Sequence, residues 1–368
     1  MSETGRLTMQ AYRFPALDHL LAMTDDVGIL QHATLDVPNR SCGYCTDDVG
    51  RALIVACEAA SRFPQDRNVS RLVSTYLAYL HDAQLPNGWF HNFMGYDRRW
   101  QDHGGTPDAV GRAIWGLGYA ERFAPRESWR ALAGELRLRA LPDVAQMEYV
   151  RSRAYAALGL VQSLATRPDD EFTVRAVLDD AAGAIADAYD AHRAPGWAWC
   201  EDVMTYDNAR LPEALLRAGQ ALGEDRYTAA GLAMLGFYVD AVIEGQTSGS
   251  GKALFQPVGS NGWYPRGGTK ARFGQQPLEA AALVDAALVA HDLTGNAEWR
   301  DIAEIAHAWY GGANVLGIPL AIEGGCRDGL DPTGCNPNQG AESTLSYLMS
   351  AIALANRSTT SLSLSVAK

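Results

Sequence analysis

The sequence contains no run of about 18 consecutive apolar residues, the length that a membrane-spanning helix requires, and no cluster of lysine and arginine. Lys and Arg total 31 against 43 Asp and Glu, so the formal net charge is −12 at pH 7. This acidic balance argues against nucleic acid or an anionic membrane surface as the main partner. Residues 1–19 lack the apolar core of a signal peptide, so we expect a cytoplasmic protein.

Cysteine is sparse, and only Cys42 and Cys45 form a Cys-x-x-Cys pair. No second pair and no His-x-x-x-His motif follows at the spacing of a zinc site. The Gly-Gly pairs at 104–105, 267–268 and 324–325 neither follow a predicted strand nor precede Gly-Lys-Ser/Thr, so they are weak signals of a phosphate-binding loop. The sequence therefore predicts neither a metal nor another cofactor.

Strand signals are also few, whereas apolar residues recur at helical spacing along the whole chain. The predicted helices alternate between two kinds. One kind is rich in Ala, Gly and Leu, as expected of an inner helix that packs on both sides, and the other carries more charge. The inner helices begin near residues 47, 107, 147, 207, 276 and 339. This alternation predicts an all-α chain in which six helix hairpins close into a ring, the (α/α)6 toroid.

No Pro-, Gly- or Ser-rich linker divides the chain, so the ring is expected to be one domain that spans residues 1–356. The last stretch, residues 357–368, has the low-complexity sequence RSTTSLSLSVAK. We expect it to be a disordered C-terminal tail. The oligomeric state is left open.

In such a ring the inner helices run in the same direction, so the loops that precede them meet at one end. These loops are rich in aromatic, acidic and amide side chains. Sugar rings stack on aromatic side chains, and acids and amides form hydrogen bonds with sugar hydroxyls. We therefore expect a carbohydrate-binding funnel at the N-terminal ends of the inner helices.

Acidic residues are concentrated in these loops beyond what helix capping requires. Glycoside hydrolysis needs two carboxylates, one protonated to assist the leaving oxygen and one ionised to activate water or attack carbon. The candidates for these roles are Asp47, Asp48, Asp108, Glu201 and Asp207. The alternative for each acid alone is a structural role, because a carboxylate in the first turn of a helix is stabilised by the helix dipole.

A second set of side chains in or near the same loops could bind the substrate. Trp rings would stack on sugars, and the polar groups would contact hydroxyls or hold the catalytic acids in their ionised state. The predicted substrate-binding residues are His91, Asn92, Arg112, Trp199, Asn208, Trp263, Gln276 and Glu342. For the Trp residues core packing is the alternative, and for Arg112 a plain helix ion pair with Asp108.

The predicted ring, with acids at the ends of its inner helices, resembles the (α/α)6 six-hairpin glycosidase-like superfamily over about residues 13–356. Three strings, GYCTDDVGRAL (43–53), YDNARLPEALL (206–216) and NPNQGAESTLSYL (336–348), are similar to those of bacterial barrel proteins associated with carbohydrate-active enzymes and glycosyltransferases. The resemblance implies a carbohydrate-active domain with its site in the funnel. In that group the first string commonly reads Asp-Asp-Asn, and here Val49 replaces the Asn.

The first hypothesis is a glycoside hydrolase that acts on an oligosaccharide or polysaccharide, with mannose- and glucose-containing glycans among the candidates. The second hypothesis is a sugar epimerase. Sugar epimerases with this barrel resemble one another in having paired His residues on their inner helices, whereas the inner helices predicted here contain almost no His, which weakens this hypothesis. A polysaccharide lyase needs a Tyr or His base beside a neutralising group. His91-Asn92 and Tyr206 could supply these groups, so a lyase remains an alternative. The third alternative is a non-catalytic carbohydrate-binding module.

Overall fold

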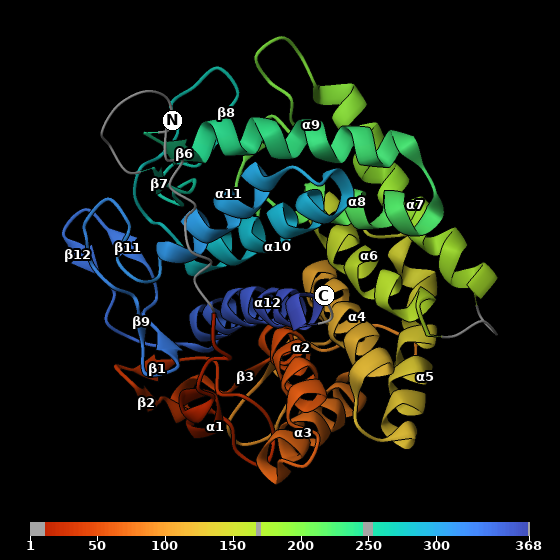
Figure 1. Ribbon diagram of the computed structural model, residues 1–368. Coiled ribbons are helices and arrows are strands. Elements are labelled where there is room, and N and C mark those ends of the chain that lie inside the picture. The colour runs from red at the N-terminus through yellow and green to blue at the C-terminus, as the bar shows by residue number, and fades with distance from the viewer. Residues whose placement is uncertain (1–11, 167–170, 246–252, 367–368) are drawn as a thin grey trace.

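The structure is a computed structural model that describes residues 12–166, 171–245 and 253–366. Six helices of the described chain form an inner ring and six an outer one (Figure 1). The inner helices are α2 (Thr46–Arg62), α4 (Pro107–Phe123), α6 (Val150–Leu164), α8 (Arg210–Leu222), α10 (Pro277–Thr294) and α12 (Ala341–Val366). The outer helices are α1 (Asp18–Met23), α3 (Arg67–Ala83), α5 (Glu127–Val144), α7 (Glu171–His192), α9 (Asp225–Val242) and α11 (Ala297–Ala308).

Most residues of the inner helices are buried because each helix packs against two inner neighbours as well as an outer helix. In α10 nearly every residue from Pro277 to Ala290 is buried. Around the ring α2 contacts α4, α4 contacts α6, and the series continues through α8 and α10 to α12, which contacts α2 again. Figure 1 shows this closure, with α12 beside the first hairpin, α2–α3. The predicted (α/α)6 toroid is confirmed.

Local sequence signals explain several helix ends. Thr106 precedes α4 and its hydroxyl accepts a hydrogen bond from the N–H of Ala109, which satisfies one of the free N–H groups of the first turn. Pro107 follows at the first helical position, where its missing N–H costs nothing. At the other end of α10, Gly295 adopts a left-handed conformation with φ of 67°, a common helix terminator.

Glycine permits the closest approach between inner helices α4 and α6. A Cβ atom added to Gly159 would lie 2.3 Å from the carbonyl oxygen of Ile114, and one added to Gly118 would lie 2.1 Å from the carbonyl oxygen of Gly159. Both distances are far below van der Waals contact, and the opposing atoms belong to the backbone. The two helix axes can therefore approach this closely only while both positions carry glycine.

Replacing Gly159 with alanine is therefore expected to destabilise the fold by about 1–3 kcal/mol, since the added methyl must push two inner helices apart. The matched control is Gly236→Ala on outer helix α9, where nothing lies within 4 Å of the added Cβ. There alanine should stabilise by about 0.4–1 kcal/mol through its higher helix propensity. Urea denaturation of both variants measures the difference, and equal midpoints would contradict this account of the packing.

The strands of the described chain are two residues long and pair as antiparallel ribbons within or between the loops that precede inner helices. The pairs are β1 (Ala33–Thr34) with β2 (Val37–Pro38), β3 (Tyr44–Cys45) with β4 (Phe93–Met94), β5 (Val203–Met204) with β8 (Tyr264–Pro265), β6 (Ile243–Glu244) with β7 (Leu254–Phe255), β9 (Ala321–Ile322) with β10 (Gly325–Cys326), and β11 (Leu330–Asp331) with β12 (Gly334–Cys335). The β3–β4 and β5–β8 ribbons join loops of different hairpins, so they tie the funnel end of the ring together.

The last helix extends beyond residue 356, into the stretch 357–368 that the sequence predicts as a disordered C-terminal tail. Helix α12 continues to Val366, and the guanidinium of Arg357 forms hydrogen bonds with both carboxylate oxygens of Asp292 on α10. The side chain of Ser358 is also buried. The first two residues of the low-complexity stretch, Arg357 and Ser358, thus pack against the rest of the ring. None of the described helices combines the length and apolarity needed to cross a membrane.

Candidate functional site

A cavity of about 580 Å³ lies beside the N-terminal ends of α2 and α12, at the predicted funnel end of the ring. Its size falls within the range of small-molecule sites. Polar side chains dominate its wall, with Phe93 as an aromatic side chain that is 39% exposed. The acids, amides and other hydrogen-bonding side chains of the lining are Gln31, His32, Thr34, Asn39, Asp47, Asp48, Arg51, Asp328, Asn336, Asn338, Glu342 and Ser343.

Asp48 is the most buried acid of this cavity and shares a guanidinium with Glu342. Its side chain is 5% exposed, and Nη2 of Arg51 donates to Asp48 Oδ1 at 2.7 Å and to Glu342 Oε2 at 3.1 Å. Burial raises the pKa of Asp48 to about 6, and the charge of Glu342 adds to the rise, while Arg51 opposes it. This carboxyl group can therefore hold or release a proton near neutral pH.

Asp47 faces the opposite direction, toward α4. Arg112 Nη1 donates to Oδ1 of Asp47 at 3.1 Å, and the amide of Asn92 donates to Oδ2 at 3.3 Å. Each oxygen of Asp47 therefore accepts a hydrogen bond from a neighbouring side chain. Asp47 is 18% exposed and lines the cavity, so it is open to a ligand. The predicted residues Asp47, Asn92 and Arg112 thus form one cluster.

Arg112 connects Asp47 to Asp108 and Asp207. Its Nη1 lies 3.5 Å from Asp108 Oδ2, and its Nη2 lies 3.7 Å from Asp207 Oδ2 and donates to the hydroxyl of Tyr155 at 2.8 Å. Tyr155 in turn donates to Asp207 at 2.7 Å. One buried guanidinium therefore joins three of the predicted acids, so Arg112 is more than the partner of a local helix pair.

Asp207 is not in the first turn of a helix, which corrects one reading of the sequence. Helix α8 begins at Arg210, and Asp207 precedes it with a φ of 51°, a conformation that non-glycine residues rarely adopt. Its N–H donates to the carboxylate of Glu279, which also accepts from Asn208 Nδ2 at 3.1 Å and from Tyr238 at 2.7 Å. Asp207 and Asn208 are 3% and 0% exposed, so both support the funnel floor from beneath.

Glu201 and Asp108 belong to a second hydrogen-bonded network, which runs through Arg151 and Tyr206. Arg151 Nη1 donates to Glu201 at 2.6 Å, and Arg151 Nε donates to the carbonyl oxygen of Tyr206 at 2.7 Å. The Tyr206 hydroxyl donates to Asp108 Oδ2 at 2.7 Å, and Ser152 donates to the other oxygen of Asp108. Glu201 is 29% exposed and Asp108 18% exposed, so both are accessible near the funnel.

His91 is held by a carboxylate and a stacked ring. Its Nδ1 lies 2.9 Å from Asp102, and its ring stacks on Trp100 with centroids 4.7 Å apart. Asp102 also accepts from the backbone N–H groups of Asn92 and Phe93. The side chain of His91 is 15% exposed. The contact at Nδ1 and the stacked Trp100 ring together fix the orientation of the imidazole.

Of the predicted substrate-binding residues, Glu342 lines this cavity. The others, His91, Asn92, Arg112, Trp199, Asn208, Trp263 and Gln276, are not among its lining residues. Trp199 is 0% exposed and packs near Tyr238, so it is a core residue with no ring face available for a sugar. Trp263 is half-buried against the core, and half-buried Gln276 immediately precedes α10. Periodicity could not separate buried from exposed Trp in these loops.

The site also contains residues that the sequence reasoning missed. Glu279 is the main acceptor beneath Asp207 and is 1% exposed. Burial raises its pKa to about 7, and the charge of Asp207 adds to this rise. Its signal in the sequence is a single acid in the otherwise apolar stretch PLEAAALV of an inner helix. Asp328, whose pKa burial raises, is a further acid of the cavity wall.

Among the described residues, no three His, Cys, Asp or Glu side chains gather in an arrangement that could hold a metal ion. Cys42 and Cys45 are free thiols, and Cys45 donates to the side-chain oxygen of Asn92 at 3.2 Å. The Cys-x-x-Cys pair is therefore part of the polar wall of the cavity.

The closed ring of six hairpins with a polar cavity at the N-terminal ends of its inner helices defines an (α/α)6 barrel. Solved structures with the same fold include a cellobiose 2-epimerase of Spirochaeta thermophila, at 12% identity and a TM-score of 0.69 over 94% of each chain. A GH76 α-mannanase of Bacteroides thetaiotaomicron matches at 11% identity and a TM-score of 0.64, over 94% of this chain and 95% of that one.

A third structure is an inactive GH76 α-1,6-mannanase variant of a Salegentibacter species, in which two consecutive aspartates are replaced by alanine, bound to α-1,6-mannotetrose. It matches at 10% identity and a TM-score of 0.56, over 92% of this chain and 95% of that one. No protein-family model matches the sequence. A search of curated proteins gives no match either. The resemblance to the six-hairpin superfamily is confirmed at the level of the fold.

Proposed function

We propose that this protein is a carbohydrate-active enzyme, and specifically a glycoside hydrolase that acts in the cavity beside α2 and α12. The observation that carries the proposal is the pair Asp47-Asp48. The two adjacent acids line one cavity but have different surroundings: Asp47 accepts hydrogen bonds at both oxygens, whereas Asp48 is buried with a pKa of about 6. Two carboxyl groups in such different environments are suited to divide the roles of acid and base between them.

In the proposed reaction Asp48 donates its proton to the glycosidic oxygen as the bond to the anomeric carbon breaks. Asp47 provides the ionised carboxylate that activates water or attacks that carbon. Arg112 and Asn92 hold Asp47 in place, and Arg51 orients Asp48. Phe93 offers a ring for stacking on a sugar, and the amides of the wall would bind hydroxyls.

The solved structures support a carbohydrate as the ligand. They include enzymes named for cellobiose and for α-mannan on the same fold. The inactive mannanase variant lacks two consecutive aspartates, and consecutive aspartates also line the cavity here. This parallel favours Asp47-Asp48 over the predicted acids Asp108, Glu201 and Asp207. We assign those three to support and substrate contact, together with Asn208 and Glu342.

The second candidate function is a sugar epimerase, which the His91–Asp102 pair favours. A histidine oriented through Nδ1 by a carboxylate can remove a proton next to a carbonyl carbon with Nε2. The cellobiose 2-epimerase neighbour shares the fold. His32 lines the cavity, whereas His91 is not among its lining residues. A lyase or a non-catalytic binding module would use the same cavity.

Incubation with defined oligosaccharides, including α- and β-mannosides and glucosides, distinguishes these functions. Mass spectrometry and proton NMR would show a new reducing end for a hydrolase and an unchanged chain length with deuterium uptake from D2O for an epimerase. A lyase would create an absorbing double bond. The hydrolase proposal expects a new reducing end that Asp47→Asn abolishes, and a glycan that binds without any change would refute it.

A further inference from the structure

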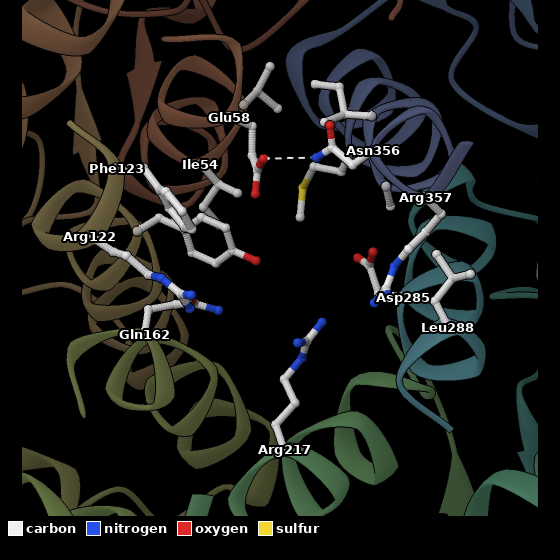
Figure 2. A pocket seen from close by; sticks show the side chains of 15 residues that line it. Ile54, Glu58, Arg122, Phe123, Gln162, Arg217, Asp285, Leu288, Asn356 and Arg357 are labelled. Atoms are coloured by element: carbon white, nitrogen blue, oxygen red, sulfur yellow. Dashed lines mark hydrogen bonds between the residues drawn. The ribbon is translucent and has the colours of Figure 1, made fainter. Parts of the chain in front are cut away.

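A second cavity, of about 210 Å³, lies at the opposite end of the ring axis, where the inner helices approach their C-termini. All six inner helices contribute side chains to its wall, from Glu58 on α2 to Asn356 on α12 (Figure 2). It is separate from the candidate active site, because the two cavities share no lining residue. None of the hydrolytic chemistry proposed above uses it.

Arg217 directs unused hydrogen-bond donors into this cavity. Its Nε donates to Glu213 at 2.8 Å, and in the described chain its two Nη atoms have no hydrogen-bond partner. Figure 2 shows the guanidinium pointing from α8 into the middle of the cavity. The side chain is 24% exposed, so these N–H groups are available to a ligand.

Arg122 approaches the same space from α4. Its Nη1 donates to Gln162 at 2.8 Å, and Figure 2 shows its guanidinium directed toward the cavity. Neither Arg122 nor Arg217 donates to a backbone carbonyl in the described part of the structure, so these two residues do not cap the helix ends. Two planar guanidinium groups on different walls therefore face one small volume.

The acids of the cavity already have partners. Asp285 accepts from Arg210 at 2.7 Å, and Glu58 accepts from Asn356 at 3.0 Å. Burial raises the pKa of both, in Asp285 to about 6, which reduces their negative charge in mildly acidic solution. The charged groups with unused hydrogen-bonding capacity toward the cavity are thus the guanidinium groups of Arg122 and Arg217, in a protein whose net charge is −12.

We propose that this cavity binds a phosphate group, either as inorganic phosphate or carried by a small metabolite. Guanidinium groups form paired, charge-assisted hydrogen bonds with phosphate oxygens, and two of them on separate walls can contact different oxygens of one tetrahedral group. Ile54, Leu288 and Met349 supply apolar wall beside them, which would accommodate a short organic portion. The volume restricts the ligand to a compact molecule.

Isothermal titration calorimetry of the full chain tests this site with two probes, inorganic phosphate and glycerol 3-phosphate. Arg217→Gln and Arg122→Gln should each weaken binding by at least about tenfold, since each removes charged donors. Arg217→Lys keeps the charge but loses the planar fork, so it should bind more weakly than the natural protein. The matched control is Arg226→Gln on outer helix α9, whose exposed guanidinium pairs with Asp187 and Asp190, and it should leave affinity unchanged.

An Asp47→Asn variant should bind phosphate as the natural protein does, because Asp47 lies at the other end of the ring. The proposal fails if neither probe binds at millimolar concentration. It also fails if both arginine-to-glutamine variants bind as tightly as the natural protein. Should Arg217→Gln not fold, Arg122→Gln decides, since Arg122 is an exposed side chain at the cavity edge. Binding of the ester alone would identify an organic phosphate as the ligand, and binding of both would identify the phosphate group itself.

Discussion

Asp48→Asn is expected to lower the rate of glycan hydrolysis by about 10²–10⁴-fold, the usual contribution of a general acid. The amide has the shape of the carboxyl group but cannot donate its proton to a leaving oxygen. Folding should survive, because burial already disfavours the charged form of Asp48 and Arg51 keeps Glu342 as a partner. Initial rates on the glycan that the oligosaccharide panel identifies measure the loss, with circular dichroism as the check on folding.

Two further observations separate a proton donor from a structural acid. In the natural protein, activity should fall as pH rises through about 6, because the proton on Asp48 is lost there. The variant should lose this descending limb of the pH profile. Asp26→Asn is the matched control, since Asp26 is 69% exposed and pairs with a surface arginine, and it should retain full activity. A folded Asp48→Asn variant with an unchanged rate would contradict the proposed role.

Glu279→Ala is expected to destabilise the protein by about 3–5 kcal/mol. The change leaves the N–H of Asp207, the amide of Asn208 and the hydroxyl of Tyr238 without their common acceptor at a site that is 1% exposed. Each buried donor left without an acceptor costs about 1–3 kcal/mol, and the lost side-chain volume adds to this. Urea denaturation at pH 7 gives the value.

The control for this loss is Glu135→Ala on outer helix α5, where the acid is 66% exposed and pairs with Arg139 one turn away. Exposed ion pairs of this kind contribute about 0.5 kcal/mol or less, so the control should change stability little. Equal effects of the two substitutions would refute the role of Glu279 as the common acceptor beneath the funnel.

The pH dependence of Glu279→Gln follows from the raised pKa of Glu279. A carboxyl group whose pKa rises from 4.5 unfolded to about 7 folded contributes stability that is fully present below 4.5 and is lost as pH rises through 7. Glutamine does not titrate. The stability advantage of the natural protein over this variant should therefore shrink between pH 4.5 and 7, and an advantage that grows over this range would contradict the raised pKa.

The ring could be predicted because the sequence patterns that define it lie within single helices and recur from one hairpin to the next. Helical periodicity, the Ala- and Gly-rich character of alternate helices and the similar spacing of their starts were sufficient to define six hairpins. Closing the ring buries the faces that each hairpin alone would expose. Helix ends were less predictable: α8 begins at Arg210 rather than at Asp207, because Asp207 directs its N–H to Glu279 instead of continuing the helix.

The sequence by itself determined the all-α ring and the end at which acids and amides would meet, since inner helices of one direction bring their preceding loops together. Only the tertiary structure decided which side chains are exposed there. Trp199 is part of the core, Asp47 pairs with Arg112 on α4, and Asp48 shares Arg51 with Glu342 on α12. The second cavity was also invisible in the sequence. Arg122 and Arg217 are 95 positions apart in the numbering and look like ordinary helix charges until the closed ring places both around one volume. Burial and long-range charge pairing depend on segments distant in the chain, and no local pattern of residues encodes them.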